Sequence, residues 1–142
     1  MQVRDVMTHG VECIPPDATL QEAAQRMEAL DVGPLPVSED GRLVGMLTDR
    51  DITVRATARG LDPKTTTVRQ VLTPRVLYCF EDQDVEDAAR LMEAQQVRRL
   101  VVLSGDKWLV GIVSLGDLAV ETGDEHLAGE ALQAVSQPVA PR

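Results

Sequence analysis

The sequence predicts an α+β protein built from two copies of a β-α-β-β-α unit, with small sheets flanked by helices. The chain has 142 residues, of which 44% are hydrophobic, and this is enough for one compact domain or two small, closely packed ones. Shifting the chain by 65 places lays VRDVMT at 3–8 over VRQVLT at 68–73. Short apolar runs alternate with segments of helical periodicity in both halves. One unit alone would bury little apolar surface, so we expect the two copies to share a core.

The repeat defines the expected domain organisation. One extra residue near Ser104 raises the shift to 66, which aligns Gly45 with Gly111, Thr48 with Ser114 and Asp51 with Asp117. A register that continues through most of both halves indicates an internal duplication. We therefore expect a first repeat at residues 1–60, a linker at 61–67, a second repeat at 68–122 and a C-terminal tail at 123–142.

Each repeat begins with the same local elements. A short helical turn is expected at 3–7 and again at 68–72, and a brief strand at 11–14 and 76–80. The amphipathic helix that follows carries apolar residues at i, i+3, i+4 and i+7: Leu20, Ala23, Ala24 and Met27 in the first copy, and Val85, Ala88, Ala89 and Met92 in the second. Thr19 and Glu22 form a capping-box pattern before the first of these helices, and Asp84 with Asp87 is a weaker version before the second.

A strand pair and a closing helix complete each repeat. We expect strands at 35–37 and 43–47 joined by a turn at Asp40-Gly41, and strands at 100–103 and 109–113 joined at Gly105-Asp106. In the first copy a helix should begin around Asp51 and stop at Gly60, because glycine commonly ends helices. The tail should form one short helix over 126–135, before Pro138 and Pro141 prevent its continuation.

A glycine, a hydroxyl residue and an aspartate recur where the last strand meets the closing helix. The pattern G-h-h-[ST]-x-x-D, in which h is apolar, covers residues 45–51 and 111–117. The simpler interpretation is a helix cap, since such a hydroxyl and carboxylate satisfy free backbone N–H groups. The functional interpretation is a ligand site. The glycine lets another group approach the strand closely, and the helix start attracts an anion. The carboxylate can accept hydrogen bonds from a diol such as that of ribose. The apolar strands are suited to a flat base.

Composition and isolated residues exclude several classes of function. The net charge of −9 argues against general nucleic-acid binding, which needs clustered Lys and Arg, although a local basic pocket can still take a small anion. No stretch approaches the length of a membrane span and no signal peptide is recognisable, so we expect a cytoplasmic protein. His9 and His126 stand alone, and Cys13 and Cys79 lack metal-ligand spacing. We expect the two cysteines to be buried thiols, with a disulfide as the alternative.

The combined motifs resemble a tandem pair of cystathionine-β-synthase (CBS) domains, an arrangement called a Bateman module. They are VRDVMT at the start, AAxxM in the long helix, VGPLPV and VRRLVV on the strands, and the closing G-h-h-[ST]-x-x-D. The resemblance covers residues 1 to about 120, nearly the entire chain. GMLTDRDI followed by GLDPKT is similar to stand-alone CBS pairs of bacteria, including the mycobacterial hypoxic response protein type.

The resemblance implies a fold and a set of binding residues. In the family, two repeats pack about a pseudo-twofold axis and leave two clefts that often bind AMP, ADP or ATP and, less often, S-adenosylmethionine. The motif aspartates, Asp51 and Asp117, would hold the ribose hydroxyls. Thr48 and Ser114 would lie near ribose or phosphate, and the basic pair Arg98-Arg99 would meet phosphate. The strand residues before each long helix would line the base pocket, namely Cys13, Ile14, Pro15, Tyr78, Cys79 and Phe80. Core packing is the alternative for these six.

The two copies depart from the family pattern in different places. The first repeat carries Gly33-Pro34 where the second has Arg98-Arg99, and Asp49-Arg50 where the second has Leu115-Gly116. The expected sites are therefore chemically unequal, and one of them can be empty. An exposed strand edge is the alternative role for the arginine pair. For Arg50 we expect a salt bridge to Asp49 or Asp51, with a phosphate contact as the alternative.

These observations favour a regulatory module without a catalytic cofactor that senses an adenosine nucleotide and acts through a protein partner or self-association. No activated nucleophile, metal cluster or P-loop is recognisable, so we expect neither an enzyme nor a metalloprotein. The alternative is a stress-related interaction protein that acts by dimerisation or partner binding without a physiological nucleotide. We expect a homodimer, because twofold pairing is the commonest way to bury outer apolar helix faces, and the resemblance implies the same.

Overall fold

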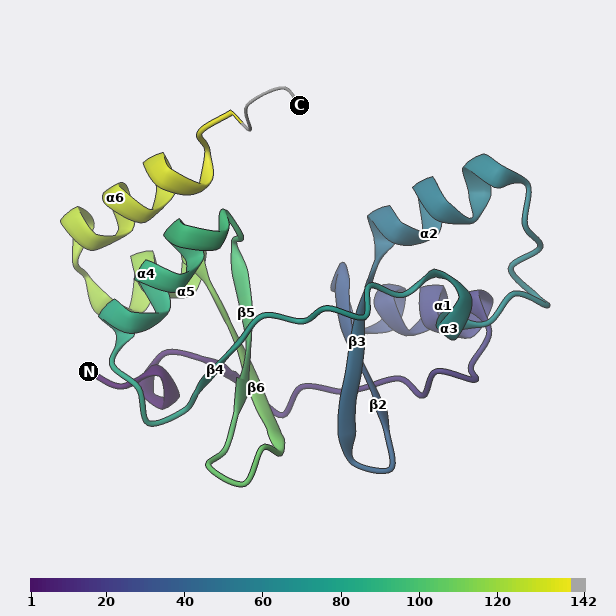
Figure 1. Ribbon diagram of the computed structural model, residues 1–142, viewed down its shortest axis with the longest axis horizontal. Helices are drawn as coiled ribbons and strands as arrows, with labels where there is room; N and C mark the ends of the chain where they lie inside the picture. Colours follow the sequence, from purple (N-terminus) through teal and green to yellow (C-terminus); the bar gives the residue numbers. More distant parts are fainter. Residues whose placement is uncertain (139–142) are drawn as a thin grey trace. The chain divides into compact units, whose positions relative to one another are not determined.

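The protein divides into two compact units, each built mainly from one repeat (Figure 1). The computed structural model describes residues 1–138. Within the described residues, unit 1 comprises 1–11 and 77–138, and unit 2 comprises 12–76. Each repeat, as the sequence defines it at 1–60 and 68–122, therefore contributes its opening segment to the unit formed by the other repeat. The predicted α+β class, with small sheets flanked by helices, is confirmed.

Unit 1 contains a four-stranded sheet in the order β1-β6-β5-β4. The strands are β1 (Thr8–His9), β4 (Tyr78–Phe80), β5 (Arg99–Leu103) and β6 (Leu109–Ser114). β5 and β6 form the predicted antiparallel hairpin, β4 lies parallel to β5, and β1 lies antiparallel to β6. The edge strand β1 comes from the opening segment of the first repeat, so this sheet needs both copies of the repeat.

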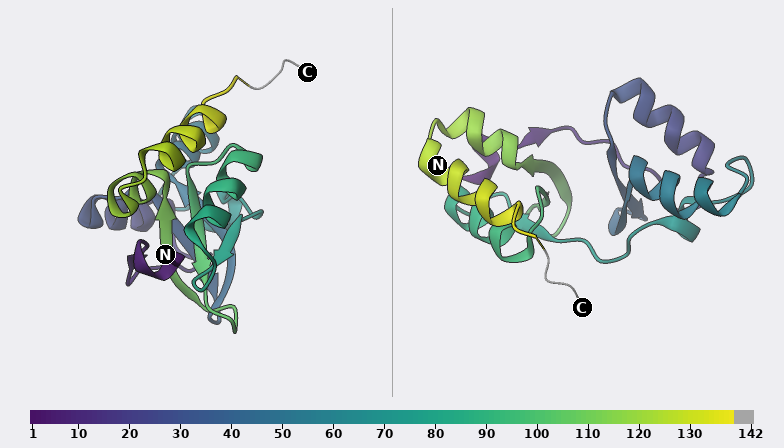
Figure 2. Two further views of the ribbon diagram at one scale, coloured as in Figure 1. Left: turned by 90° about the vertical axis from the view of Figure 1, so that its left-hand side faces the viewer. Right: turned by 90° about the horizontal axis from the view of Figure 1, so that it is seen from above.

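Helices cover one side of this sheet (Figures 1 and 2). They are α4 (Val85–Gln95), α5 (Leu115–Thr122) and α6 (Glu125–Val135), and the 3-10 helix η1 (Val3–Asp5) opens the unit. The core contains the predicted apolar face of α4 together with Val3, Leu100, Val102, Leu118 and Ala131. α6 packs on α4 and α5, so the C-terminal tail is part of the fold of unit 1.

Unit 2 has the same arrangement of a hairpin and helices, but its sheet has two strands instead of four. Its hairpin is β2 (Pro34–Glu39) with β3 (Arg42–Thr48), and its helices are α1 (Leu20–Leu30), α2 (Asp49–Arg55), the 3-10 helix η2 (Thr57–Arg59) and α3 (Val68–Val71). Single bridges stand where unit 1 has edge strands: Ile14 pairs with Val37 in parallel, and Thr73 pairs with Met46 antiparallel. The predicted strand at 11–14 is thus only one bridge, whereas its copy begins as a strand at Tyr78.

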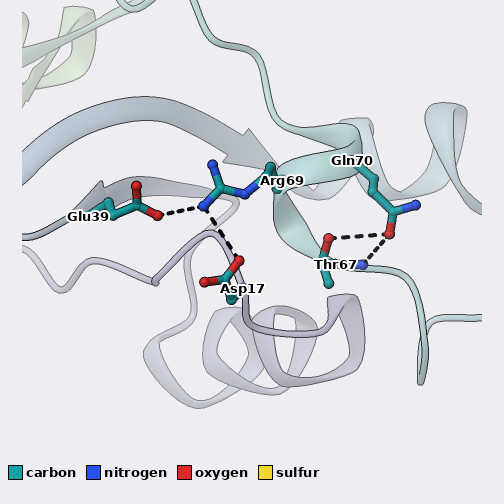
Figure 3. Close-up of polar contacts among 5 residues, drawn as sticks. All are labelled: Asp17, Glu39, Thr67, Arg69 and Gln70. Carbon is teal, nitrogen blue, oxygen red and sulfur yellow. Dashed lines mark hydrogen bonds and ion pairs between the residues drawn. The ribbon is translucent and has the colours of Figure 1, made fainter.

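Equivalent hydrogen bonds hold the two exchanged opening segments. Val3 N–H donates to the Gln83 carbonyl at 2.8 Å, and Val68 N–H donates to the Ala18 carbonyl at 2.8 Å. Arg4 pairs with Glu81 at 3.7 Å. Its copy, Arg69, lies 2.5 Å from Glu39 and 3.4 Å from Asp17 (Figure 3). Figure 3 also shows Gln70 accepting from the Thr67 N–H at 2.8 Å, which caps α3.

The paired carboxylates also affect the protonation of Arg69. Its hydrogen bond to Glu39 and the charge of Glu39 raise the pKa of the guanidinium above its usual value, with a smaller contribution from Asp17. Arg69 is half exposed, so solvent screens this ion pair and it contributes little to stability. The ion pair joins the exchanged segment to Glu39 of β2 and to Asp17.

The two motif glycines are required by this exchange. A Cβ on Gly111 would lie 2.7 Å from the Thr8 carbonyl oxygen, and one on Gly45 would lie 2.7 Å from the Thr73 carbonyl oxygen. Both approaches are far inside van der Waals contact. The close approach that we expected at these glycines is therefore made by the backbone of the exchanged segment, and the glycines are explained without a ligand.

The remaining differences from the predicted elements are local. α2 begins at Asp49, two residues before the expected Asp51. Gly60 ends η2 with φ +71°, as expected of a glycine that ends a helix. Ala24 is exposed although we expected it to lie on the buried face of α1, whereas its copy Ala89 is fully buried. α6 ends three residues before Pro138, and Pro141 lies outside the described residues.

Candidate anion site at the start of α5

The start of α5 is a complete capping box. Ser114 Oγ accepts from the Asp117 N–H at 3.0 Å, and Asp117 Oδ2 accepts from the Ser114 N–H at 2.9 Å. The Leu115 N–H donates to the Arg98 carbonyl at 2.9 Å. β5, β6 and α5 therefore meet at one fixed point, and the backbone of Arg98 is tied directly to the helix start.

The start of α2 has the same geometry in unit 2. Thr48 Oγ1 accepts from the Asp51 N–H at 3.1 Å, and Asp51 Oδ2 accepts from the Thr48 N–H at 3.0 Å. The helix-cap interpretation of the motif is thus correct for both copies. It leaves room for a second role, because Oδ1 of Asp51 and of Asp117 accepts no hydrogen bond from another residue within 1–138.

A hollow of about 530 Å³ lies over the start of α5. It is lined by Arg98 and Arg99 and, from the start of α5, by Ser114, Leu115, Gly116 and Ala119. α6 contributes Ala128, Gly129 and Leu132 to the same lining. The volume falls within the range of small-molecule sites, which combine an apolar lining with a few convergent polar groups. Three of the predicted phosphate-site residues, Arg98, Arg99 and Ser114, therefore lie together.

The electrostatics of this hollow favour an anion. Arg98 and Arg99 are both exposed, and within residues 1–138 neither forms an ion pair with a carboxylate. The start of α5 adds partial positive charge, which the capping carboxylate of Asp117 partly offsets. Two arginines without a carboxylate partner, next to a helix start, are suited to phosphate.

The corresponding position in unit 2 is chemically different. Gly33-Pro34 stands in place of the arginines. The Asp49 carboxylate lies directly over Gly33, since a Cβ there would be 3.0 Å from Asp49 Oδ1. That oxygen accepts from the Arg50 N–H at 3.0 Å. A carboxylate of the protein itself thus lies at the start of α2, where it repels another anion.

The expected salt bridge of Arg50 is wrong. In the part of the chain that the structure describes, Arg50 pairs with neither Asp49 nor Asp51. Each of these carboxylates instead accepts a backbone N–H, from Arg50 and Thr48 respectively. The Arg50 side chain is exposed at the helix start, where water solvates it at little cost.

The six residues predicted for a base pocket do not line the hollow of unit 1. Cys13, Ile14 and Pro15 belong to unit 2, where Ile14 is a buried core residue. In unit 1, Cys79 is buried in the core. Tyr78 and Phe80 share one face of β4, as the alternation predicted, and their rings meet edge to face at 5.7 Å. Core packing, the alternative we gave for these residues, therefore describes Ile14 and Cys79.

The two cysteines are free thiols in different surroundings. Burial raises the pKa of the Cys79 thiol to about 11, which makes it a poor nucleophile at neutral pH. Cys13 is partly exposed, and its carbonyl accepts from Arg26 Nη1 at 2.8 Å. The alternative of a disulfide is not realised in this structure.

The contribution of α6 was missed by sequence reasoning. The helix lies outside both repeats, so the alignment of the copies gave it no partner and no role. One local signal was present: Gly129 lies inside the helix, where glycine costs about 1 kcal/mol relative to alanine. A Cβ on Gly129 would meet no atom within 4 Å, so the missing side chain leaves open space along the hollow.

The described residues contain no group of three or more His, Cys, Asp or Glu side chains that could hold a metal ion. None of the helices in the described part of the chain is long and apolar enough to cross a membrane.

Comparison with known proteins agrees with the architecture described above. A family model, described as the CBS domain, matches residues 3–56 and 68–122. The chain belongs to the CBS domain family. Both predicted repeats are covered by these matches, and the resemblance drawn from the motifs is confirmed. CBS pairs are regulatory ligand-binding modules, and stand-alone members are generally non-catalytic.

Several relatives are of similar length to this CBS pair. The CBS domain-containing protein YhcV of Bacillus subtilis is 45% identical over 134 residues, which cover 94% of each chain. Hypoxic response protein 1 of Mycobacterium tuberculosis is 40% identical over 138 residues, covering 96% of this chain and 95% of the relative.

Solved structures of CBS proteins share the fold. The crystal structure of Hypoxic Response Protein I, which has two coordinated zinc ions, has a TM-score of 0.73 at 42% identity and covers 84% of this chain and 97% of its own. The CBS pair of protein MJ0100, solved in complex with 5′-methylthioadenosine and S-adenosyl-L-methionine, has a TM-score of 0.75 at 25% identity and covers 87% of this chain and 96% of its own.

Proposed function

We propose that this CBS pair is a non-catalytic sensor that binds a phosphate-bearing adenosine compound, AMP, ADP or ATP, at the hollow of unit 1. The observation that carries the proposal is the convergence of Arg98, Arg99 and Ser114 on one hollow at the start of α5. Two unpaired guanidinium groups supply charge-assisted hydrogen bonds to phosphate. The adenosine part of the proposal is supported by the MJ0100 complex, whose two ligands both contain adenosine.

Within this proposal the motif residues have distinct roles. Ser114 and the α5 start lie near phosphate or ribose. Asp117 is not among the residues that line the hollow; in this proposal its Oδ1 atom accepts from the ribose hydroxyls at the edge of the site. Thr48 and Asp51 would play the same part at the start of α2. The Asp49 carboxylate and the absence of an arginine pair make that second site much weaker, so we propose one occupied nucleotide site per chain. S-adenosylmethionine carries no phosphate, so we expect it to bind more weakly than the nucleotides.

The output of such a sensor is a change in association. A ligand shifts a conformational equilibrium only by its difference in affinity for the two states. We propose that this CBS pair passes the shift on through a protein partner or a second copy. We propose a homodimer: apolar side chains at Leu30, Val54 and Leu61 are exposed on unit 2, and pairing of two copies would cover such residues. Light scattering that returns only the monomer mass of 15.5 kDa would contradict it.

Mass spectrometry of the small molecules that co-purify with the protein tests the proposed function, together with a thermal-shift screen of AMP, ADP, ATP, adenosine and S-adenosylmethionine. A true ligand at 100 times its Kd adds about 2.7 kcal/mol to the free energy of unfolding. We expect phosphate-bearing adenosine compounds to raise the melting temperature. The absence of any shift, with no co-purified nucleotide, would instead favour an interaction protein that acts without one.

A further inference from the structure

Helix α6 presents two different faces to unit 1. One face is structural: Ala131 is fully buried in the core, and the Gln96 side-chain amide donates to the carbonyls of Ala134 and Gln137 at 3.3 and 3.2 Å. The other face lines the hollow with Ala128, Gly129 and Leu132. The first face anchors the helix, so the second is held in place along the hollow that the arginines also line.

This second face is apolar and has room beside it. Leu132 is 49% exposed, and a Cβ on Gly129 would meet no protein atom within 4 Å. The hollow is therefore cationic along Arg98 and Arg99 and apolar along α6. A bare phosphate ion would satisfy the arginines and leave the α6 wall uncovered. A ligand with a phosphate at one end and an apolar, flat group at the other would cover both.

We infer that α6 is the ligand-contacting wall that selects the body of the nucleotide, with Gly129 providing the space and Leu132 the apolar contact. This inference rests on the proposed nucleotide function and adds to it a recognition element that lies outside both CBS repeats. Bound ligand bridges the arginines of β5 and the face of α6, so it stabilises the docked position of the C-terminal helix. Unit 2 has no counterpart of α6 among the described residues, and this is a second reason for its weaker site.

Calorimetry with AMP and with inorganic phosphate, on the full chain, tests the inference. Gly129→Leu adds a side chain where the unliganded protein has space, and leucine favours the helix over glycine, so the variant folds. The matched control is Gln133→Leu, which adds the same side chain at an exposed α6 position outside the hollow. We expect Gly129→Leu to weaken AMP binding about tenfold or more, because an overfilled site must distort to accept the ligand, and Gln133→Leu to bind AMP as the parent does.

A second variant separates recognition of the body from recognition of phosphate. Leu132→Ala should weaken AMP several-fold and leave inorganic phosphate unchanged, because only the apolar contact is lost. AMP binding that depends on Arg98 and Arg99 but is unchanged in Gly129→Leu and Leu132→Ala overturns the role of α6 and leaves the proposed function standing. Inorganic phosphate that binds as tightly as AMP also overturns it. If the parent protein binds no adenosine compound, both the proposed function and this inference are wrong.

Discussion

The starts of α2 and α5 are built alike and surrounded differently. Both have a hydroxyl–aspartate capping box, and both are approached by an exchanged segment that only glycine admits. Around these shared features, α5 has two nearby arginines and Leu115 as its first residue, whereas α2 has Gly33 and the carboxylate of Asp49 at the matching positions. The repeated motif therefore accounts for the fold of both units, and the residues that differ between the copies account for where an anion can bind.

A second contrast concerns the long helices α1 and α4. Ala89 of α4 is buried, and α6 packs on that helix, while Ala24 at the same place in α1 is exposed. The duplicated sequence thus gives two different surfaces, because only one copy is followed by an extra helix.

The largest expected effect tests the packing of the exchanged segments against the motif glycines of both units. Gly111→Ala and Gly45→Ala should each lower the free energy of unfolding by about 1–3 kcal/mol or more, because the new methyl group would collide with a backbone carbonyl. Gly105→Ala is the matched control, since a Cβ there meets no atom within 4 Å. Urea denaturation measures all three. If the motif variants unfold like the control, the exchanged segments do not pack against these strands.

The next effect tests the arginine pair. Arg98→Ala with Arg99→Ala should weaken AMP and ATP roughly a hundredfold, since a hydrogen bond to a charged group contributes about 1.5–3 kcal/mol and two guanidinium groups are lost. Adenosine should bind as before because it carries no phosphate. Titration calorimetry gives both affinities. An equal loss for adenosine would show that the arginines do not act through phosphate.

Substitution of the two motif aspartates should affect AMP affinity differently, and should change stability little in either case. Asp117→Asn should weaken AMP by roughly 10- to 100-fold through loss of a charged acceptor for the ribose, while Asp51→Asn should leave AMP binding close to that of the parent. Both variants should keep most of their stability, because asparagine retains a capping oxygen. Calorimetry and thermal melting decide this. If both variants bind AMP like the parent and melt several degrees lower, the aspartates are caps and nothing more.

The smallest effect comes from adding a carboxylate to the start of α5, at Gly116, one position after Leu115, the counterpart of Asp49. Gly116→Asp places a carboxylate at the start of α5, which should stabilise the helix by about 0.3–1 kcal/mol through its dipole and weaken AMP roughly tenfold by repulsion. Gly116→Asn has the same size without the charge and serves as the control. Thermal melting and calorimetry on the two variants separate these effects. A carboxylate that leaves AMP affinity unchanged would place the phosphate away from this helix start.

Local features of the fold were predictable because residues close together in the sequence determine them. The hairpins, the Thr19–Glu22 cap and the tail helix all depend on spacing within a few residues, and the repeat is visible when the chain is shifted by 65 places. The exchange of opening segments was not predictable in this way. The repeat shows that Thr8 and Thr73 occupy equivalent positions, but not that each pairs with the hairpin of the other copy.

The candidate site was predictable only where the two copies could be compared. Arg98, Arg99 and Ser114 were identified because they match the pattern or depart from the other repeat, and they do lie around one hollow. The α6 wall belongs to neither copy, so no comparison pointed to it. For Ile14 and Cys79, alternation along a strand could not tell a ligand-facing side from a core-facing one, and both residues face the core.

The number of AMP molecules bound per chain tests the central claim most directly. Equilibrium dialysis of the parent and of the double variant Arg98→Ala with Arg99→Ala gives that number for each protein. We expect one tightly bound AMP per chain in the parent, and its loss in the double variant. Two equivalent AMP molecules per chain, or one that remains in the double variant, would contradict it.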